Sequence, residues 1–263
     1  MLSVFSDNSI LTFCILVAAI LGAVMGSFLN CVAWRIAHEE KWWTGRSHCP
    51  SCGHALGLPD LLPLLSWLLL RGKCRYCGAK IPARYFLTEL FFALCTVLVL
   101  LRFDLSVLAL RNYIFVCCLF CLALVDLEIF IIPDGCLLVA AGAWLLALPF
   151  VGWSWGYVWP RLLAALVFGG GMLLLSLVMD RILHKESLGG GDVKLFAVVG
   201  LYLGLGSTLL AVVLSCVLGL LLGLIKRGED QHIPFGPAIS LAAFLVLLWG
   251  EPVINWYLGL FGI

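Results

Sequence analysis

Residues 10–34, ILTFCILVAAILGAVMGSFLNCVAW, run without a single acidic or basic side chain. About 20 apolar residues in a helix cross the ~30 Å hydrocarbon core of a bilayer, so this stretch predicts a membrane-spanning helix. A cleaved signal peptide is the alternative interpretation. Against it, no Lys or Arg precedes the stretch, the apolar run is too long, and no small-residue cleavage site follows. We therefore expect a retained first span.

The composition extends this prediction to the whole chain. Of 263 residues, 63% are hydrophobic and 12% are charged, whereas soluble domains carry about 25% charged residues. The net charge of +1 gives no reason to expect a nucleic-acid partner. The sequence thus predicts an all-α polytopic membrane protein with about eight transmembrane helices. The expected spans are 10–34, 85–101, 112–129, 133–151, 161–179, 193–203, 208–225 and 235–249.

Lys and Arg residues are distributed unequally between the two sides of this arrangement. All but Arg102, Arg111 and Arg161 of the 16 basic residues fall in loops that share one side. Basic residues are retained on the cytoplasmic side of membrane proteins. We therefore expect that side to be cytoplasmic and both termini to lie outside.

One loop is long enough and polar enough to fold by itself. It contains Cys49-Pro-Ser-Cys52 and Cys74-Arg-Tyr-Cys77, two C-x-x-C pairs that can place four thiolates around one zinc ion. Two disulfides are the rival interpretation, but the cytosol keeps thiols reduced. A closed four-sulfur shell leaves no position for water, so the zinc would be structural. The predicted organisation is a first helix (1–34), a cytoplasmic zinc-ribbon-like insert (35–84), and helices 2–8 with the reactive site (85–263).

Two groups of acidic residues lie at the ends of apolar stretches, on the same side of the membrane. They are the segment 126–134, DLEIFIIPD, and the segment 189–194, GGGDVK. Because charge is costly in hydrocarbon, acids at such positions are candidates for function. A pair of carboxylates can hydrolyse a peptide bond, since one accepts a proton from water while the other polarises the carbonyl. Asp126 and Asp192 are the predicted pair.

Other residues of these segments remain alternatives or supports. Glu128 and Asp134 compete for the first catalytic position, and Lys194 could pair with Asp192 or help to position the site. The three glycines Gly189, Gly190 and Gly191 would permit backbone conformations closed to other residues. A proton- or cation-coupled secondary transporter with a zinc module is the alternative function. Against a transporter, the acids lie near one face, whereas transporter sites lie near the midplane.

Ordered motifs along most of the chain make it similar to a known family. They are Gly26-Ser-Phe-Leu-Asn30, Ser47–Cys52, Ser66-Trp67 with Arg71–Cys74, Arg84-Tyr85 with Glu89, Asp126 with Ile132-Pro133-Asp134, Gly189–Leu195 and Pro234-Phe235-Gly236-Pro237. In these motifs the chain resembles the type IV prepilin peptidases. These are bifunctional leader peptidase/N-methyltransferases of the bacterial inner membrane, and they belong to the GxGD aspartyl proteases.

The resemblance implies an activity, cofactors and partners. It implies cleavage of the short basic leader of prepilins or pseudopilins at the cytoplasmic face, in a type IV pilus or type II secretion system. Asp126 and Asp192 match the family's catalytic aspartates. The resemblance further implies methylation of the new N-terminal residue with S-adenosylmethionine.

No fingerprint of a methyl-donor site is present, so the donor's ligands are unknown from the sequence. The insert is the only folded element expected at the cytoplasmic surface. Our hypothesis therefore places the donor between the insert and the end of the first span, near Asn30. Glu39, Glu40 or Glu89 could contact its sulfonium or the amine.

Overall fold

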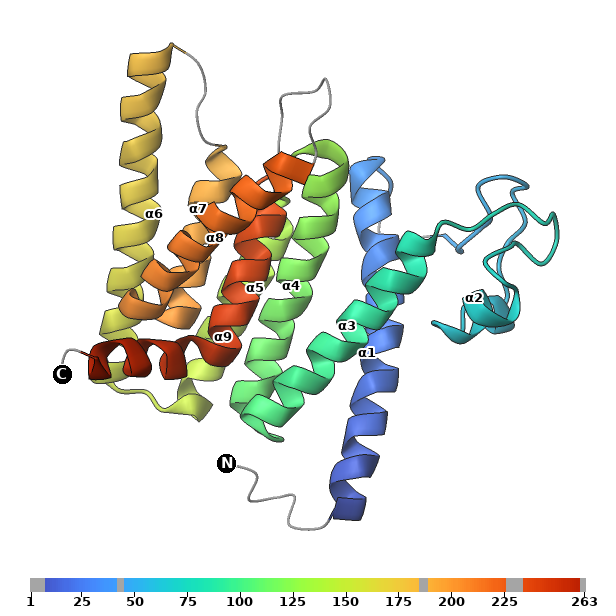
Figure 1. Ribbon diagram of the computed structural model, residues 1–263, viewed down its shortest axis with the longest axis horizontal. Helices are drawn as coiled ribbons and strands as arrows, with labels where there is room; N and C mark the ends of the chain where they lie inside the picture. Colours follow the sequence, from blue (N-terminus) through green and yellow to red (C-terminus); the bar gives the residue numbers. More distant parts are fainter. Residues whose placement is uncertain (1–7, 42–44, 185–188, 226–233, 261–263) are drawn as a thin grey trace. The chain divides into compact units, whose positions relative to one another are not determined.

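The computed structural model describes residues 8–41, 45–184, 189–225 and 234–260, and throughout them the regular structure is helical apart from two isolated β-bridges (Figure 1). The chain divides into two compact units, residues 1–109 and residues 110–263. We describe each unit by itself.

The first unit consists of two long helices and the insert that joins them. Its elements are α1 (Asn8–Ala37), the short 3-10 helix η1 (Leu58–Asp60), α2 (Leu65–Leu69) and α3 (Ala83–Phe103). Glycines allow α1 to approach α3 closely. A Cβ atom on Gly22 would lie 2.8 Å from Ala93 Cα, and one on Gly26 would lie 3.0 Å from Phe92 Cβ. Small residues at a helix crossing are typical of packing inside membranes, where backbones approach closely.

The second unit is a bundle built around one short helix. Its elements are α4 (Val107–Ile129), which begins at the unit boundary, α5 (Asp134–Val151), α6 (Trp155–Leu183), α7 (Gly190–Leu203), α8 (Leu205–Ile225) and α9 (Gly236–Gly259). The helix α7 contacts α5, α6, α8 and α9. Its side chains Leu195, Phe196 and Val199 are almost fully buried, and a Cβ atom on Gly200 would lie 2.7 Å from Ala165 N of α6.

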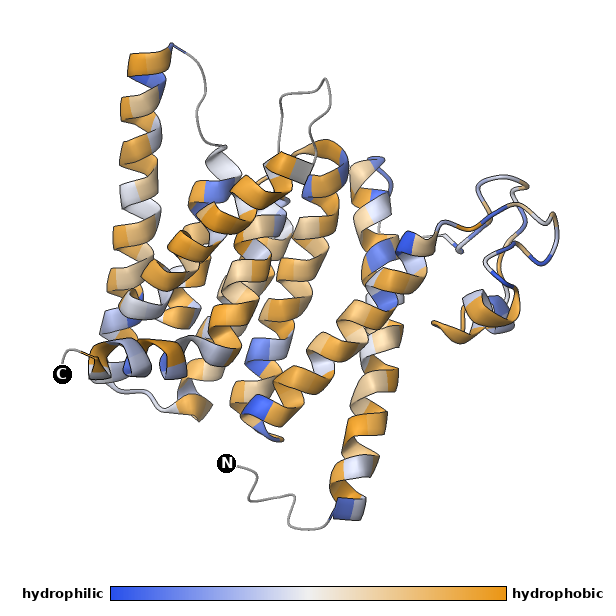
Figure 2. Ribbon diagram, viewed as in Figure 1, coloured by the Kyte–Doolittle hydropathy of each residue, from blue (hydrophilic) through white to orange (hydrophobic). Residues whose placement is uncertain are grey.

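Seven of the described helices are long and apolar enough to cross a membrane. Figure 2 shows that most residues along these helices are hydrophobic. The exception among the expected eight is α7, whose 14 residues extend only about 21 Å at 1.5 Å per residue. It ends at Gly204, which has a φ of +75°, and its neighbours shield it on several sides.

The expected span boundaries are otherwise close, with three larger differences. The helix α4 begins at Val107 instead of Asn112. The helix α6 begins at Trp155 instead of Arg161, because Ser154 caps it by accepting a 3.2 Å hydrogen bond from Tyr157 N. The helix α9 continues beyond Trp249 to Gly259 and accommodates Pro252.

Candidate active site and candidate zinc centre

The two cysteine pairs lie in two turns with the same hydrogen-bond pattern. In the first, Cys49 N donates to His54 O and Gly53 N donates to Cys49 O. In the second, Cys74 N donates to Ala79 O and Gly78 N donates to Cys74 O. Gly53 and Gly78 have φ values of +70° and +72°, a region that glycine enters without steric cost. The local sequence therefore forms two zinc-knuckle-like turns.

These turns bring all four predicted sulfur ligands together. The Sγ atoms of Cys49, Cys52, Cys74 and Cys77 lie within 4.8 Å of one another, and those of Cys49 and Cys77 are 3.9 Å apart. Tetrahedral zinc with Zn–S bonds of ~2.3 Å requires sulfurs separated by about 3.8 Å. No disulfide joins any two of these four cysteines in the structure. The donor set and its spacing fit a zinc ion.

Backbone amides prepare one of these thiols for metal binding. The N–H groups of Cys52 and then Ser51 lower the pKa of Cys49 to about 6. Because the thiolate is the form that binds metal, the lowered pKa favours Cys49 as a metal ligand at neutral pH. Desolvation and the neighbouring thiols raise the pKa of Cys77 to about 11.

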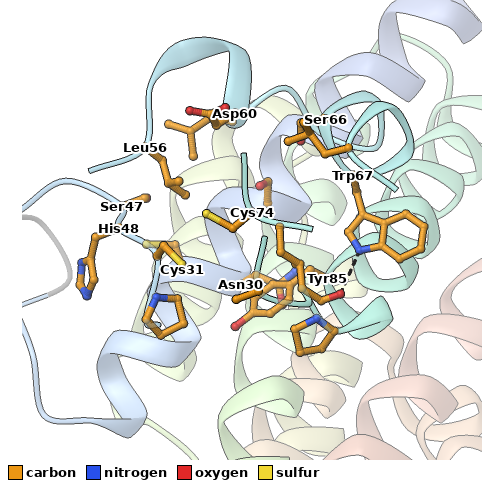
Figure 3. A pocket seen from close by; sticks show the side chains of 18 of the residues that line it. Asn30, Cys31, Ser47, His48, Leu56, Asp60, Ser66, Trp67, Cys74 and Tyr85 are labelled. Carbon is orange, nitrogen blue, oxygen red and sulfur yellow. Dashed lines mark hydrogen bonds between the residues drawn. The ribbon is translucent and has the colours of Figure 1, made fainter. Parts of the chain in front are cut away.

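A cavity of about 340 Å³ lies between the cysteine turns and the two long helices of the first unit (Figure 3). Asn30 from α1, Trp67 from α2 and Glu89 from α3 contribute to its wall. Glu89 is buried, and its Oε2 accepts a 2.8 Å hydrogen bond from Leu64 N. Of the three acids in our donor hypothesis, Glu89 lines this cavity. Glu39 and Glu40 are exposed beyond the end of α1 and are not among its lining residues.

A second acid of the cavity wall was not predicted from the sequence. Asp60 accepts hydrogen bonds from Gly57 N at 3.1 Å, Tyr76 Oη at 3.0 Å and Arg75 Nε at 2.8 Å. The Gly57 amide, followed by Tyr76 and Arg75, holds the pKa of Asp60 below its usual range. The resulting stabilisation of the insert is present at neutral pH, and it is lost as the pH falls through the lowered pKa.

In the second unit, Asp126 lies one turn before the end of α4. Its side chain is buried, and Oδ2 accepts a 2.9 Å hydrogen bond from Gly236 N at the start of α9. A Cβ atom on residue 236 would lie only 2.7 Å from this oxygen. Gly236 thus allows the backbone of α9 to approach and orient the carboxylate.

Asp192 lies in the first turn of α7 and is half-buried. It is close enough to Asp126 for the two carboxyl groups to interact electrostatically. The connection after Asp126 packs on the same turn, because a Cβ atom on Gly191 would lie 2.8 Å from Ile132 Cβ. The structure therefore brings together the two acidic segments that the sequence marked.

The three glycines before Asp192 do not have the unusual backbone that we expected. Gly189 caps α7 with a φ of −64°, and Gly190 and Gly191 are helical, so any residue type could adopt these angles. Only Gly191 is required for close packing, against Ile132, while a Cβ atom on Gly190 would meet nothing within 4 Å. The close approach at Gly191 is between a side chain and the backbone, which the local sequence does not reveal. The role of the glycines in supporting the site stays a prediction.

Lys194 forms an ion pair, but with Asp134. Its Nζ lies 2.8 Å from Asp134 Oδ1 and 3.0 Å from Oδ2, and both side chains are more than half exposed. The pair connects the first turn of α5 to the first turn of α7. Glu128 is half-buried on α4, and a residue two positions after Asp126 does not share its helix face.

Two protein families match successive parts of the chain. A family described as the bacterial peptidase A24 N-terminal domain matches residues 20–103, and the type IV leader peptidase family matches residues 113–224. No solved structure matches the chain.

Curated relatives match over nearly their whole length. A prepilin leader peptidase/N-methyltransferase of Aeromonas hydrophila is 32% identical over 89% of this chain and 90% of its own. One of Bacillus subtilis (strain 168) is 33% identical over 91% and 96%. A type 4 prepilin-like proteins leader peptide-processing enzyme of Escherichia coli O78:H11 is 34% identical over 88% and 92%. With both cysteine turns and both acidic segments inside the matched regions, the chain belongs to the type IV leader peptidase family.

Proposed function

We propose that this protein is an intramembrane aspartyl endopeptidase that removes the leader of prepilins or pseudopilins and methylates the new N-terminal residue. The observation that supports the peptidase part is the packing of the segment after Asp126 against the first turn of α7, which carries Asp192, so that the two carboxyl groups interact electrostatically. The names of the relatives supply the substrate class and the second activity. No observation favours the transporter.

The two acids would act on a water molecule and a peptide carbonyl. One carboxylate accepts a proton from the water as it attacks, and the other, protonated, donates a hydrogen bond to the carbonyl oxygen. The amide of Gly236 donates a hydrogen bond to one oxygen of Asp126 and so fixes the orientation of its carboxylate. We assign Gly191 as a positioning residue, because its missing Cβ atom lets the segment after Asp126 pack on the first turn of α7. The exposed Lys194–Asp134 ion pair adds a weaker link between the starts of α5 and α7.

The cavity of the first unit suits the methyl donor. S-adenosylmethionine, when bound, supplies a methyl group to an amine. Trp34, Trp67 and Tyr85 line the cavity and offer aromatic faces that attract adenine and the sulfonium cation. The buried carboxyl group of Glu89 lines the same wall and could accept a hydrogen bond from, or attract, a cationic ligand. We therefore assign the donor to this cavity and the zinc to its cysteine wall.

The location and partners follow from the family. We propose a multi-pass protein of the bacterial inner membrane, with the zinc insert and the acids on the cytoplasmic side, where the basic residues gather. Its substrates would carry a short basic leader before an apolar segment and would serve a type IV pilus or type II secretion system. We propose that the chain is organised as it was predicted from the sequence, with a first helix (1–34), an insert (35–84) and a peptidase region (85–263).

The test is the incubation of the purified chain in detergent with a prepilin and methyl-labelled S-adenosylmethionine. We expect the prepilin to shorten on a gel and the label to appear in the shortened product only. A prepilin that remains intact would contradict the peptidase assignment. Shortening without label would contradict the methyltransferase assignment alone.

The close contact at Gly236 gives a quantitative prediction. In Gly236→Ala the new Cβ atom must displace the Asp126 carboxylate, because the two atoms would otherwise be 2.7 Å apart. A displacement of about 1 Å can cost ~10²-fold in rate, so we expect leader cleavage to slow by about that factor. In the control Gly142→Ala, the Cβ atom meets nothing within 4 Å and the rate should not change. Equal rates in the two variants would show that the Asp126–Gly236 contact is unimportant.

A further inference from the structure

Six leucines of the insert expose large apolar surfaces. Leu58 is 85% exposed, Leu69 79% and Leu65 57%. With them, the set that we call the leucine patch consists of Leu58, Leu61, Leu62, Leu65, Leu68 and Leu69. Figure 2 shows α2 as a hydrophobic element at the end of an otherwise largely polar insert. Concentrated apolar surface of this kind marks an interaction site.

The outer face of α2 is not required to hold the insert together. Leu65, Leu68 and Leu69 have the i, i+3, i+4 spacing of one helix face, and all three are exposed. The intervening residues Ser66 and Trp67 line the cavity instead. The helix therefore packs inward through one side and presents leucines on the other.

Contacts with α3 fix the depth of α2 relative to the membrane. Trp67 lies 5.0 Å from the Phe86 ring, and Leu64 N donates to Glu89, so α2 adjoins the first two turns of α3. With 21 residues, α3 is about 31 Å long, which only just spans the ~30 Å hydrocarbon core. Its first two turns therefore lie where hydrocarbon meets the headgroups. Figure 1 shows α2 beside the half of α3 that contains its beginning.

Further exposed leucines lie along α3, and basic side chains follow the leucine patch in the sequence. Leu87, Leu90 and Leu94 are exposed along α3, where a membrane-spanning helix faces lipid. Arg71 and Lys73 follow α2 directly, and both are exposed. Basic side chains beside an apolar face are typical of helices that lie in the interface of an anionic membrane.

We propose that the leucine patch is embedded in the boundary between headgroups and acyl chains of the adjoining leaflet. Its occupant is phospholipid, and the insert is an interfacially anchored module. The consequence is that the α2 wall of the cavity, with Ser66 and Trp67, is held at the membrane surface. This inference rests on the membrane-spanning helices and the insert contacts alone and not on the proposed activities.

The test measures lipid contact in the full-length protein. A fluorescent amino acid is incorporated at position 69, or at the exposed control position 55 of the first cysteine turn, and the protein is placed in phosphatidylethanolamine/phosphatidylglycerol nanodiscs. We expect doxyl groups near the headgroups to quench the probe at 69 several-fold more than the probe at 55. Bound zinc, measured on both proteins, shows that the insert remains folded.

Two outcomes would overturn the proposal. Equal quenching at positions 69 and 55 would place the leucine patch in water. A second such outcome is that lipid does not quench the probe at 69 but that added prepilin shields this probe from a water-soluble quencher. The patch would then be a docking surface for the substrate's apolar segment. As a second variant, Leu65→Gln with Leu68→Gln and a probe at 69 should lose most of the quenching while retaining zinc.

Discussion

Replacement of Asp126 or Asp192 by Asn is expected to abolish leader cleavage. Asn retains the shape of the side chain but cannot accept or transfer the proton, and general acid–base catalysis contributes about 10²–10⁴-fold to a rate. For Asp126 the Gly236 amide still finds an oxygen acceptor, so the bundle should remain folded. The measurement is the single-turnover rate of prepilin shortening by each purified variant, with thermal unfolding as the check on integrity.

The neighbouring acids provide matched controls for this prediction. Glu128→Gln and Asp134→Asn make the same chemical change within the same segment. We expect Glu128→Gln to retain cleavage, because residue 128 does not share the Asp126 face of α4. Asp134→Asn removes an exposed ion pair with Lys194. Because exposed ion pairs contribute little to folding stability, the cleavage rate should change only slightly. Cleavage that survives Asp126→Asn but is lost in Asp134→Asn would show that Asp134 is the catalytic acid.

Substitution of Ser for Cys49 and Cys52 is expected to release about one zinc per chain and to unfold the insert. Structural zinc in small peptides contributes ~10–16 kcal/mol of binding free energy that is also folding free energy. Two ligands would be lost from a shell whose sulfurs lie within 4.8 Å of one another. Metal analysis measures the release, and the rate of proteolysis within the insert measures the unfolding.

The control for this experiment is Cys216→Ser, at an exposed position on α8. It removes a thiol from the second unit and should leave the zinc content unchanged. Intact wild-type protein without zinc would contradict the prediction. Two disulfides in the insert under non-reducing conditions would contradict the zinc site and, with it, the cytoplasmic placement of the insert.

Much of this organisation could be predicted from the sequence, because its signals are local. Uncharged runs mark spans wherever they occur, and a C-x-x-C pair followed by Gly specifies a tight turn. Acids at the ends of such runs are costly enough to indicate function. These signals identified the cysteine pairs, Asp126 and Asp192 without any knowledge of their contacts.

The remaining features depend on packing between distant segments. Gly236 contacts Asp126 across 110 positions of sequence, and nothing near Gly236 indicates that its missing Cβ makes room for a carboxylate. Gly191 is needed because Ile132 lies against it, and not for its backbone freedom. The leucine patch could not be predicted from the sequence. In a mostly apolar chain, an exposed leucine cannot be distinguished from a buried one until the structure is known.

The central claim is that the two activities are divided between the units, with cleavage at Asp126 and Asp192 and methyl transfer at the zinc-supported cavity. The most direct measurement is the mass spectrum of a prepilin incubated with S-adenosylmethionine and the Cys49→Ser, Cys52→Ser protein, beside wild type and Asp192→Asn. We predict that wild type gives a shortened and methylated product, whereas the cysteine variant gives a shortened product without the methyl group. Asp192→Asn should leave the prepilin intact but should still bind labelled donor. Parallel loss of cleavage and methylation in the cysteine variant would contradict the division, and the insert would then serve as a scaffold or substrate dock for both reactions.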